Sequence, residues 1–181
     1  MNNINDPINI LPADRIASFK PYFFASLNLK LAELRAKKVD IIRIDIGSPD
    51  LPPADFIIET LVEAARRPDT HGYTANGGSP AFRQAIADYY LNRFDVNLDP
   101  AKETIALVGS KEGLFNLSQV LVNPGDIVLA PDPGYPVYQA SGIIAGAQIY
   151  TMPLCRENRF LPKFSDIPEW ILEHSKLLWL N

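Results

Sequence analysis

The chain has 181 residues, of which 47% are hydrophobic and 21% charged, a composition that is ordinary for a folded globular protein. Its 17 basic and 21 acidic residues give a net charge of −4, and no cluster of Lys or Arg forms the basic surface that nucleic acids and anionic membranes require. The single Cys155 excludes an internal disulfide and a cysteine metal site, and no apolar run approaches the roughly 20 residues of a membrane span.

The N-terminal region predicts a polar arm followed by a helix. The first ten residues, MNNINDPINI, lack the basic and apolar regions of a secretory signal peptide, so we expect a cytoplasmic protein. We expect residues 1–14 to form a loose arm. Apolar residues then recur every three or four positions between Ile16 and Lys38, which indicates an amphipathic helix with its first turn or a break at Pro21.

Strand and helix signals alternate through the next part of the chain. Residues 40–46 alternate in polarity and predict a strand, which ends in a proline-rich turn that begins at Gly47. Residues 54–67 predict a helix, and a glycine-rich loop over residues 71–80 contains Tyr73. Ser79 is a suitable N-cap and Pro80 a suitable first residue for a helix over residues 81–94.

The stretch from Thr104 to Tyr138 predicts a strand, a helix and a second strand. The strands are expected at residues 104–108 and 127–130, and a polar turn follows each. A short helix (139–145), a strand (148–152), a helix (166–174) and a last strand (176–180) complete the pattern. This alternation predicts an α/β fold with a mostly parallel sheet and helices on both faces, preceded by the N-terminal helical arm.

Two turns at predicted strand exits carry candidate ligand-binding residues, because ligands bind beyond the carboxyl ends of strands in open α/β sheets. In Gly109-Ser110-Lys111, the first amides of a helix, a hydroxyl and an ammonium group could hold a phosphate, although the same residues could serve only as a helix cap. Prolines flank the Gly134-Tyr135 pair, so Tyr135 could stack on a planar ring or merely occupy a surface turn.

Two other loops offer weaker candidates. The amides near Gly47 could receive a carboxylate, and Tyr73 could reach a ligand or another subunit, although both loops could also have no such role. No Ser/His/Asp set, carboxylate pair or metal-ligand cluster stands out. From the residues alone, the sequence therefore indicates an α/β domain that binds a phosphorylated planar ligand.

In order along the chain, four motifs resemble the class I/II aminotransferases, which are fold-type I pyridoxal-phosphate enzymes. The motifs are DIIRIDIGSPDLPP, HGYTANGGSPAFRQAIADYY, GSKEG and VNPGDIVLAPDPGYPVY. The sequences GSKEG and PGYPVY within these motifs most resemble those of the bacterial LL-diaminopimelate aminotransferases. The resemblance implies the N-terminal part of the fold-type I large domain, with residues 1–46 as an arm and helix that contribute to the small domain and dimer contact. Residues 47–181 would then form an incomplete pyridoxal-phosphate-binding domain.

The resemblance also implies roles for individual residues. Ser110 and Lys111 match positions that hold the cofactor phosphate, and Lys111 is also near the substrate. Tyr135 matches the aromatic residue that stacks on the pyridine ring next to the substrate. Tyr73 matches a tyrosine that reaches the neighbouring subunit's phosphate, which implies a homodimer. Gly47 and Tyr22 match substrate-side positions, and the reaction would transfer an amino group between an amino acid and a 2-oxo acid, with LL-diaminopimelate and 2-oxoglutarate as candidates.

One feature of the resembled family has no counterpart in these 181 residues. The family's Schiff-base lysine lies in the second half of a chain about twice this long, and no lysine here matches it, so we expect an N-terminal portion that lacks a catalytic residue. Two alternatives stay open: another fold-type I enzyme, such as a C–S lyase or a synthase, and a non-catalytic remnant that binds a phosphorylated ligand or a partner.

We predict that residues 1–181 alone do not transaminate, because they lack the lysine that anchors the cofactor and transfers the proton. The measurement is turnover of an amino acid and a 2-oxo acid by the purified 181-residue chain with added pyridoxal phosphate. Measurable turnover would contradict the prediction.

Overall fold

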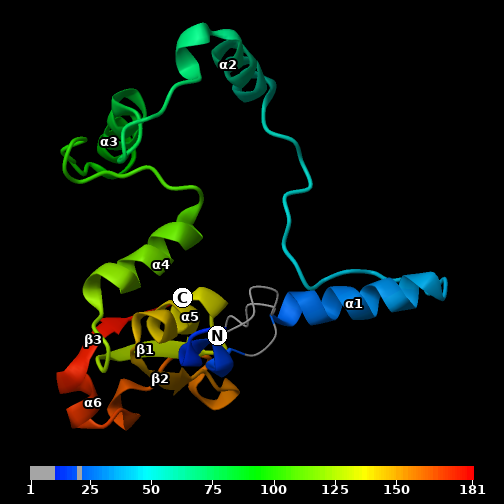
Figure 1. Cartoon of the computed structure of the whole chain (residues 1–181), viewed down its shortest axis with the longest axis vertical. Coiled ribbons are helices and arrows are strands. Elements are labelled where there is room, and N and C mark those ends of the chain that lie inside the picture. Colours follow the sequence, from blue (N-terminus) through cyan, green and yellow to red (C-terminus); the bar gives the residue numbers. More distant parts are fainter. Residues whose placement is uncertain (1–10, 20–21) are drawn as a thin grey trace, which may run out of the picture. The chain divides into compact units, whose positions relative to one another are not determined.

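The computed structural model describes residues 11–19 and 22–181 (Figure 1). The chain forms two compact units, one made of Met1–Tyr22 with Leu107–Asn181 and the other of Phe23–Ala106. Residues 1–10 of the expected polar arm and the expected break at Pro21 lie outside the described residues.

The first unit contains a three-stranded parallel sheet, as the sequence predicts. Strand β1 (Ile127–Asp132) lies in the centre, between β2 (Gln148–Pro153) and β3 (Ser175–Leu178). Val128 is in register with Ile149 of β2 and with Leu177 of β3, and both pairings are parallel. The three strands therefore end at the same edge of the sheet.

Helices cover both faces of this sheet, which Figure 1 shows for α5 and α6. They are α4 (Ser110–Leu121), α5 (Pro136–Ala145) and α6 (Glu169–His174). Side chains alternate between the faces of a strand, so Val128 of β1 packs in a core with α4 and α5, whereas Leu129 packs in a second core with Ile171 of α6. The predicted arrangement of helices on both faces is confirmed.

The second unit is helical in the structure. It contains α1 (Phe23–Ala36), α2 (Asp55–Arg66) and α3 (Pro80–Phe94). The predicted start of α3 is confirmed, because the Ser79 hydroxyl oxygen accepts a hydrogen bond from the Phe82 amide at 3.2 Å. Short 3-10 helices occur in both units, at Asp14–Ser18, Pro68–Thr70, Arg156–Asn158 and Phe164–Asp166.

Two predicted strands, at residues 40–46 and 104–108, are wrong for this structure. Neither segment pairs with another strand among the described residues, and Ile44 and Val108 are each 94% exposed. The alternating polarity of residues 40–46 and the apolar run of residues 104–108 are local properties, whereas a strand requires hydrogen-bond partners from another segment. These local patterns therefore predicted extended backbone but could not supply the pairing.

A buried polar contact joins α4 to α5. The Ser118 and Ser141 hydroxyls lie 2.8 Å apart and both residues are 0% exposed. Ser141 also donates to the Tyr138 carbonyl oxygen at 3.2 Å, so each hydroxyl has a partner away from water. Buried polar groups without partners are costly, so this contact favours one packing of the two helices.

We predict that Ser141→Ala lowers the free energy of unfolding more than Ser118→Ala does. The first change leaves the Ser118 hydroxyl buried without its partner, at a cost of about 1–3 kcal/mol, whereas the second leaves Ser141 bonded to the Tyr138 carbonyl. Urea unfolding measures both variants. The double variant should lose less than the sum of the single losses, and equal losses in the two single variants would contradict the prediction.

Candidate functional site

The turn before α4 forms a cluster of hydrogen-bond donors. Gly109 is the N-cap, with φ 80° and ψ 151°, a conformation that favours glycine, and no atom lies within 4 Å of the position that a Cβ would take. Ser110 and Lys111 begin the helix, where backbone amides have no intrahelical acceptor. The Glu112 carboxylate turns back and accepts from the Val108 amide at 2.6 Å. The open amides, the hydroxyl and the ammonium group are the donors that an anion requires.

The structure brings Lys111 against Tyr135. The Lys111 ammonium nitrogen lies 5.1 Å from the centroid of the Tyr135 ring, a cation–π contact between the start of α4 and the start of α5. A side-chain hydrogen bond with Tyr135, followed by the electrostatic effects of the Tyr135 and Tyr22 phenols, raises the pKa of Lys111 above its usual 10.5. The site therefore keeps a positive charge at every physiological pH.

A tight turn between β1 and α5 sets the position of Tyr135. A Cβ on Gly134 would lie 2.4 Å from the Pro131 carbonyl oxygen, so only glycine permits this close approach of the backbone. Tyr135 is the N-cap of α5 and Pro136 is the first residue of that helix. Tyr135 is 38% exposed. The expected strand-exit turn thus presents a partly exposed ring beside the donors of α4.

Tyr138, which the sequence analysis did not select, lies next to this ring and contacts two further residues that it did not select, Trp179 and Asn181. The Tyr138 ring contacts Tyr135 edge-to-face at 5.8 Å and stacks on Trp179 at 5.2 Å. The Tyr138 hydroxyl donates to Asn181 Oδ1 at 2.9 Å. The spacing of three residues between Tyr135 and Tyr138 at a helix start is a signal for the first contact, but no local pattern indicates the contacts with residues near 180.

The other predicted site residues differ in their surroundings. Tyr22 belongs to the same unit as Lys111 and contributes to the electrostatic environment of its ammonium group. Gly47 and Tyr73 belong to the other unit, which comprises residues 23–106. Within that unit, Tyr73 is fully exposed in a loop, and nothing lies within 4 Å of a Cβ built on Gly47.

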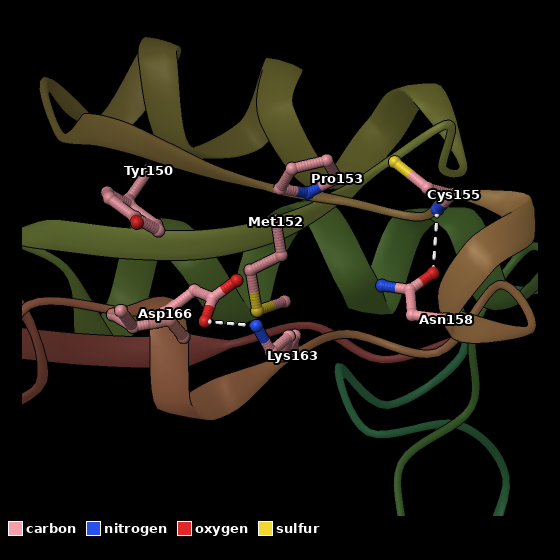
Figure 2. A pocket seen from close by; sticks show the side chains of 8 residues that line it. Tyr150, Met152, Pro153, Cys155, Asn158, Lys163 and Asp166 are labelled. Atoms are coloured by element: carbon pink, nitrogen blue, oxygen red, sulfur yellow. Dashed lines mark hydrogen bonds and ion pairs between the residues drawn. The ribbon is translucent and has the colours of Figure 1, made fainter.

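A separate pocket of about 200 Å³ lies beside the end of β2 and contains none of the predicted site residues (Figure 2). Met152 and Ile167 contribute buried apolar surface, and Lys163 and Asp166 form an ion pair at 2.7 Å. Because the two charged groups neutralise each other, this pocket offers weaker anion recognition than the start of α4. Its remaining lining residues are Tyr150, Pro153, Cys155 and Asn158.

The donor cluster fits the phosphate of pyridoxal phosphate, and the adjoining ring fits its planar pyridine. Ser110 and Lys111 would hold the phosphate, and the exposed face of Tyr135 would cover the ring. Residues 11–19 and 22–181 contain no group of three or more His, Cys, Asp or Glu side chains that could hold a metal ion, and no helix there is long and apolar enough to cross a membrane. The fold and site define an α/β domain suited to a phosphorylated, planar ligand.

A family comparison identifies the class of protein. The sequence model of the family described as aminotransferase class I and II matches residues 39–181, which is most of the chain. The chain therefore belongs to the class I and II aminotransferase family, whose members use pyridoxal phosphate.

Curated relatives and solved structures agree with this membership. The chain is 46% identical to the LL-diaminopimelate aminotransferases of Aquifex aeolicus and Moorella thermoacetica, each over 93% of this chain and over 44% and 43% of the relative. The apo-BacF structure from Bacillus subtilis is 38% identical, with a TM-score of 0.85 over 96% of this chain and 44% of that chain. An aminotransferase structure from Staphylococcus aureus is 30% identical, with a TM-score of 0.79 over 93% and 42%. The chain thus spans less than half the length of these relatives.

We predict that Lys111→Gln weakens the binding of inorganic phosphate about tenfold, because a charged donor contributes about 1.5 kcal/mol or more to such a hydrogen bond. The raised pKa of Lys111 keeps the ammonium charged, so wild-type affinity should stay constant between about pH 7.5 and 9.5 and fall only above 10.5.

Phosphate titration followed by ³¹P NMR measures both effects. Lys176→Gln, at an exposed lysine of β3, is the matched control and should retain wild-type affinity. Equal losses in the two variants, or a wild-type affinity that falls near pH 8, would contradict the assignment of Lys111.

Proposed function

We propose that this chain is the cofactor-binding N-terminal part of a pyridoxal-phosphate-dependent aminotransferase. The observation that carries the proposal is the contact of the Lys111 ammonium with the Tyr135 ring at the start of α4. It joins a phosphate-compatible donor cluster to an aromatic face, which is the combination that a phosphorylated pyridine requires. Family membership supports the same cofactor.

The residues of the site would act by binding and orientation. The Ser110 hydroxyl and the first amides of α4 would donate hydrogen bonds to the phosphate, and the Lys111 charge would neutralise it. Tyr135 would restrict the pyridine ring to one plane and exclude water from one side of it. Lys111 and Tyr135 would also face the substrate. When bound, pyridoxal phosphate supplies an electron sink for the substrate Cα carbanion.

We propose amino-group transfer between LL-diaminopimelate and 2-oxoglutarate as the reaction. The curated relatives named as LL-diaminopimelate aminotransferases support this choice of substrates. Because the chain spans 44% of the Aquifex aeolicus relative, the activity is proposed for a polypeptide of that length that contains this chain.

Substrate and subunit roles for the remaining predicted residues are part of the same proposal. Gly47 and Tyr22 would lie on the substrate side, and the exposed Tyr73 would reach the phosphate in the neighbouring subunit of a cytoplasmic homodimer. We also propose a functional division into an arm and helix over residues 1–46, which contribute to the small domain and dimer contact, and an incomplete cofactor-binding domain over residues 47–181. The full exposure of Tyr73 is compatible with a contact across subunits.

The test is transamination by a polypeptide of the relatives' length that carries this chain, supplied with pyridoxal phosphate, LL-diaminopimelate and 2-oxoglutarate. We expect glutamate formation, and we expect Tyr135→Leu to weaken cofactor binding about three- to tenfold, as an aromatic contact of about 0.5–1.5 kcal/mol predicts.

Tyr89→Leu, at an exposed tyrosine of α3, serves as the control and should retain wild-type cofactor affinity. Cofactor binding without glutamate formation from diaminopimelate or any other amino donor would overturn the proposed reaction. Failure to bind pyridoxal phosphate would overturn the proposal as a whole.

A further inference from the structure

Tyr138 lies between the exposed Tyr135 and the buried Trp179. Its ring meets Tyr135 edge-to-face at 5.8 Å with an interplanar angle of 76°, and stacks on Trp179 at 5.2 Å with an angle of 13°. Tyr138 is 7% exposed and Trp179 is 8% exposed, whereas Tyr135 is 38% exposed. The three rings thus form a row that runs from the core of the first unit to the candidate ligand surface.

Contacts with a distant segment hold the Tyr138 end of this row. The Tyr138 hydroxyl donates to Asn181 Oδ1 at 2.9 Å, across 43 positions of sequence. The Trp179 amide donates to the Leu129 carbonyl oxygen of β1 at 2.9 Å, which fixes the stacking partner to the central strand. Tyr138 is therefore held on its Trp179 face and at its hydroxyl.

Tyr135 has fewer constraints of its own. It is the N-cap of α5, it has no side-chain capping bond, and one part of its surface is open. The Lys111 ammonium lies against the Tyr135 ring, but it stands at the end of a long flexible side chain. The buried ring of Tyr138, which is anchored by Trp179 and Asn181, is the surface that meets the Tyr135 ring.

We infer that Tyr138 is a positioning residue for the candidate cofactor site, where it holds the Tyr135 ring in the orientation that covers a bound pyridine. This inference rests on the proposed function and deepens it. Tyr138 would not contact the phosphate, because that group is assigned to the donors at the start of α4. The competing interpretation is that Tyr138 only stabilises the core.

Two probes separate these interpretations in the 181-residue chain. Pyridoxal phosphate would use both the donor cluster and Tyr135, whereas inorganic phosphate would use only the donor cluster. We expect Tyr138→Leu to weaken pyridoxal phosphate binding about three- to tenfold and to change phosphate binding less than about twofold. Tyr138→Phe retains the ring and should bind both probes within about twofold of the wild type, although it loses the bond to Asn181.

Val137→Ala is the matched control, because Val137 lies in the same helix and core and is also 7% exposed. It should lower the urea midpoint while both affinities stay at the wild-type level. Adding Tyr138→Leu to Tyr135→Leu should weaken pyridoxal phosphate binding no further, because the residue through which Tyr138 acts is already absent.

The outcomes distinguish the inference from the function on which it rests. Equal losses for both probes in Tyr138→Leu, or a further loss in the double variant, would overturn the positioning role while the proposed function stands. A wild-type chain that binds pyridoxal phosphate no more tightly than inorganic phosphate would overturn the proposed function and the inference with it. A wild-type chain without a cooperative urea transition would contradict the packed row of rings and overturn the inference directly.

Discussion

The double burial of strand β1 is the constraint on which the rest of the first unit depends. β1 is hydrogen-bonded on both edges, and Val128 and Ala130 are 0% exposed beneath α4 and α5 while Ile127 and Leu129 are covered on the α6 side. A strand in this position leaves no freedom of register, because a slip of one residue would exchange its two sets of side chains. The point at which β1 ends is consequently as well defined as the core itself.

The candidate site is built on that fixed point. Directly after β1, the turn through Gly134 presents Tyr135, and α5 then returns over the sheet. The start of α4 reaches the same place because the Ser118–Ser141 contact and the shared apolar core hold α4 against α5. The contact between Lys111 and Tyr135 is therefore a consequence of how two helices pack on one strand, and its geometry depends on burial far from the ligand surface.

Charged groups and aromatic rings come from different parts of the candidate site. The α4 start supplies positive charge and hydrogen-bond donors, and the Glu112 carboxylate of its first turn is bonded to the Val108 amide. The row of Tyr135, Tyr138 and Trp179 supplies an aromatic surface that is supported from the core. In the proposed site, the first would receive the phosphate of a phosphorylated planar cofactor and the second would cover its ring.

Local features were predictable from the sequence alone, because they depend on neighbouring residues. The Ser79 cap, the Gly109-Ser110-Lys111 helix start and the rigid turn before Tyr135 all follow from the conformational preferences of a few consecutive residues. The ordered motifs also identified the family and the cofactor that the comparisons support.

Tertiary structure alone decided which extended segments pair and which side chains meet. Residues 40–46 and 104–108 have strand-like patterns but no strand partner among the described residues, whereas residues 175–178 pair with β1. The contacts of Tyr138 with Trp179 and Asn181 span about forty positions, and no local pattern specifies them. Pairing and packing depend on distant segments that compete for the same surfaces, so they emerge only when the whole unit folds.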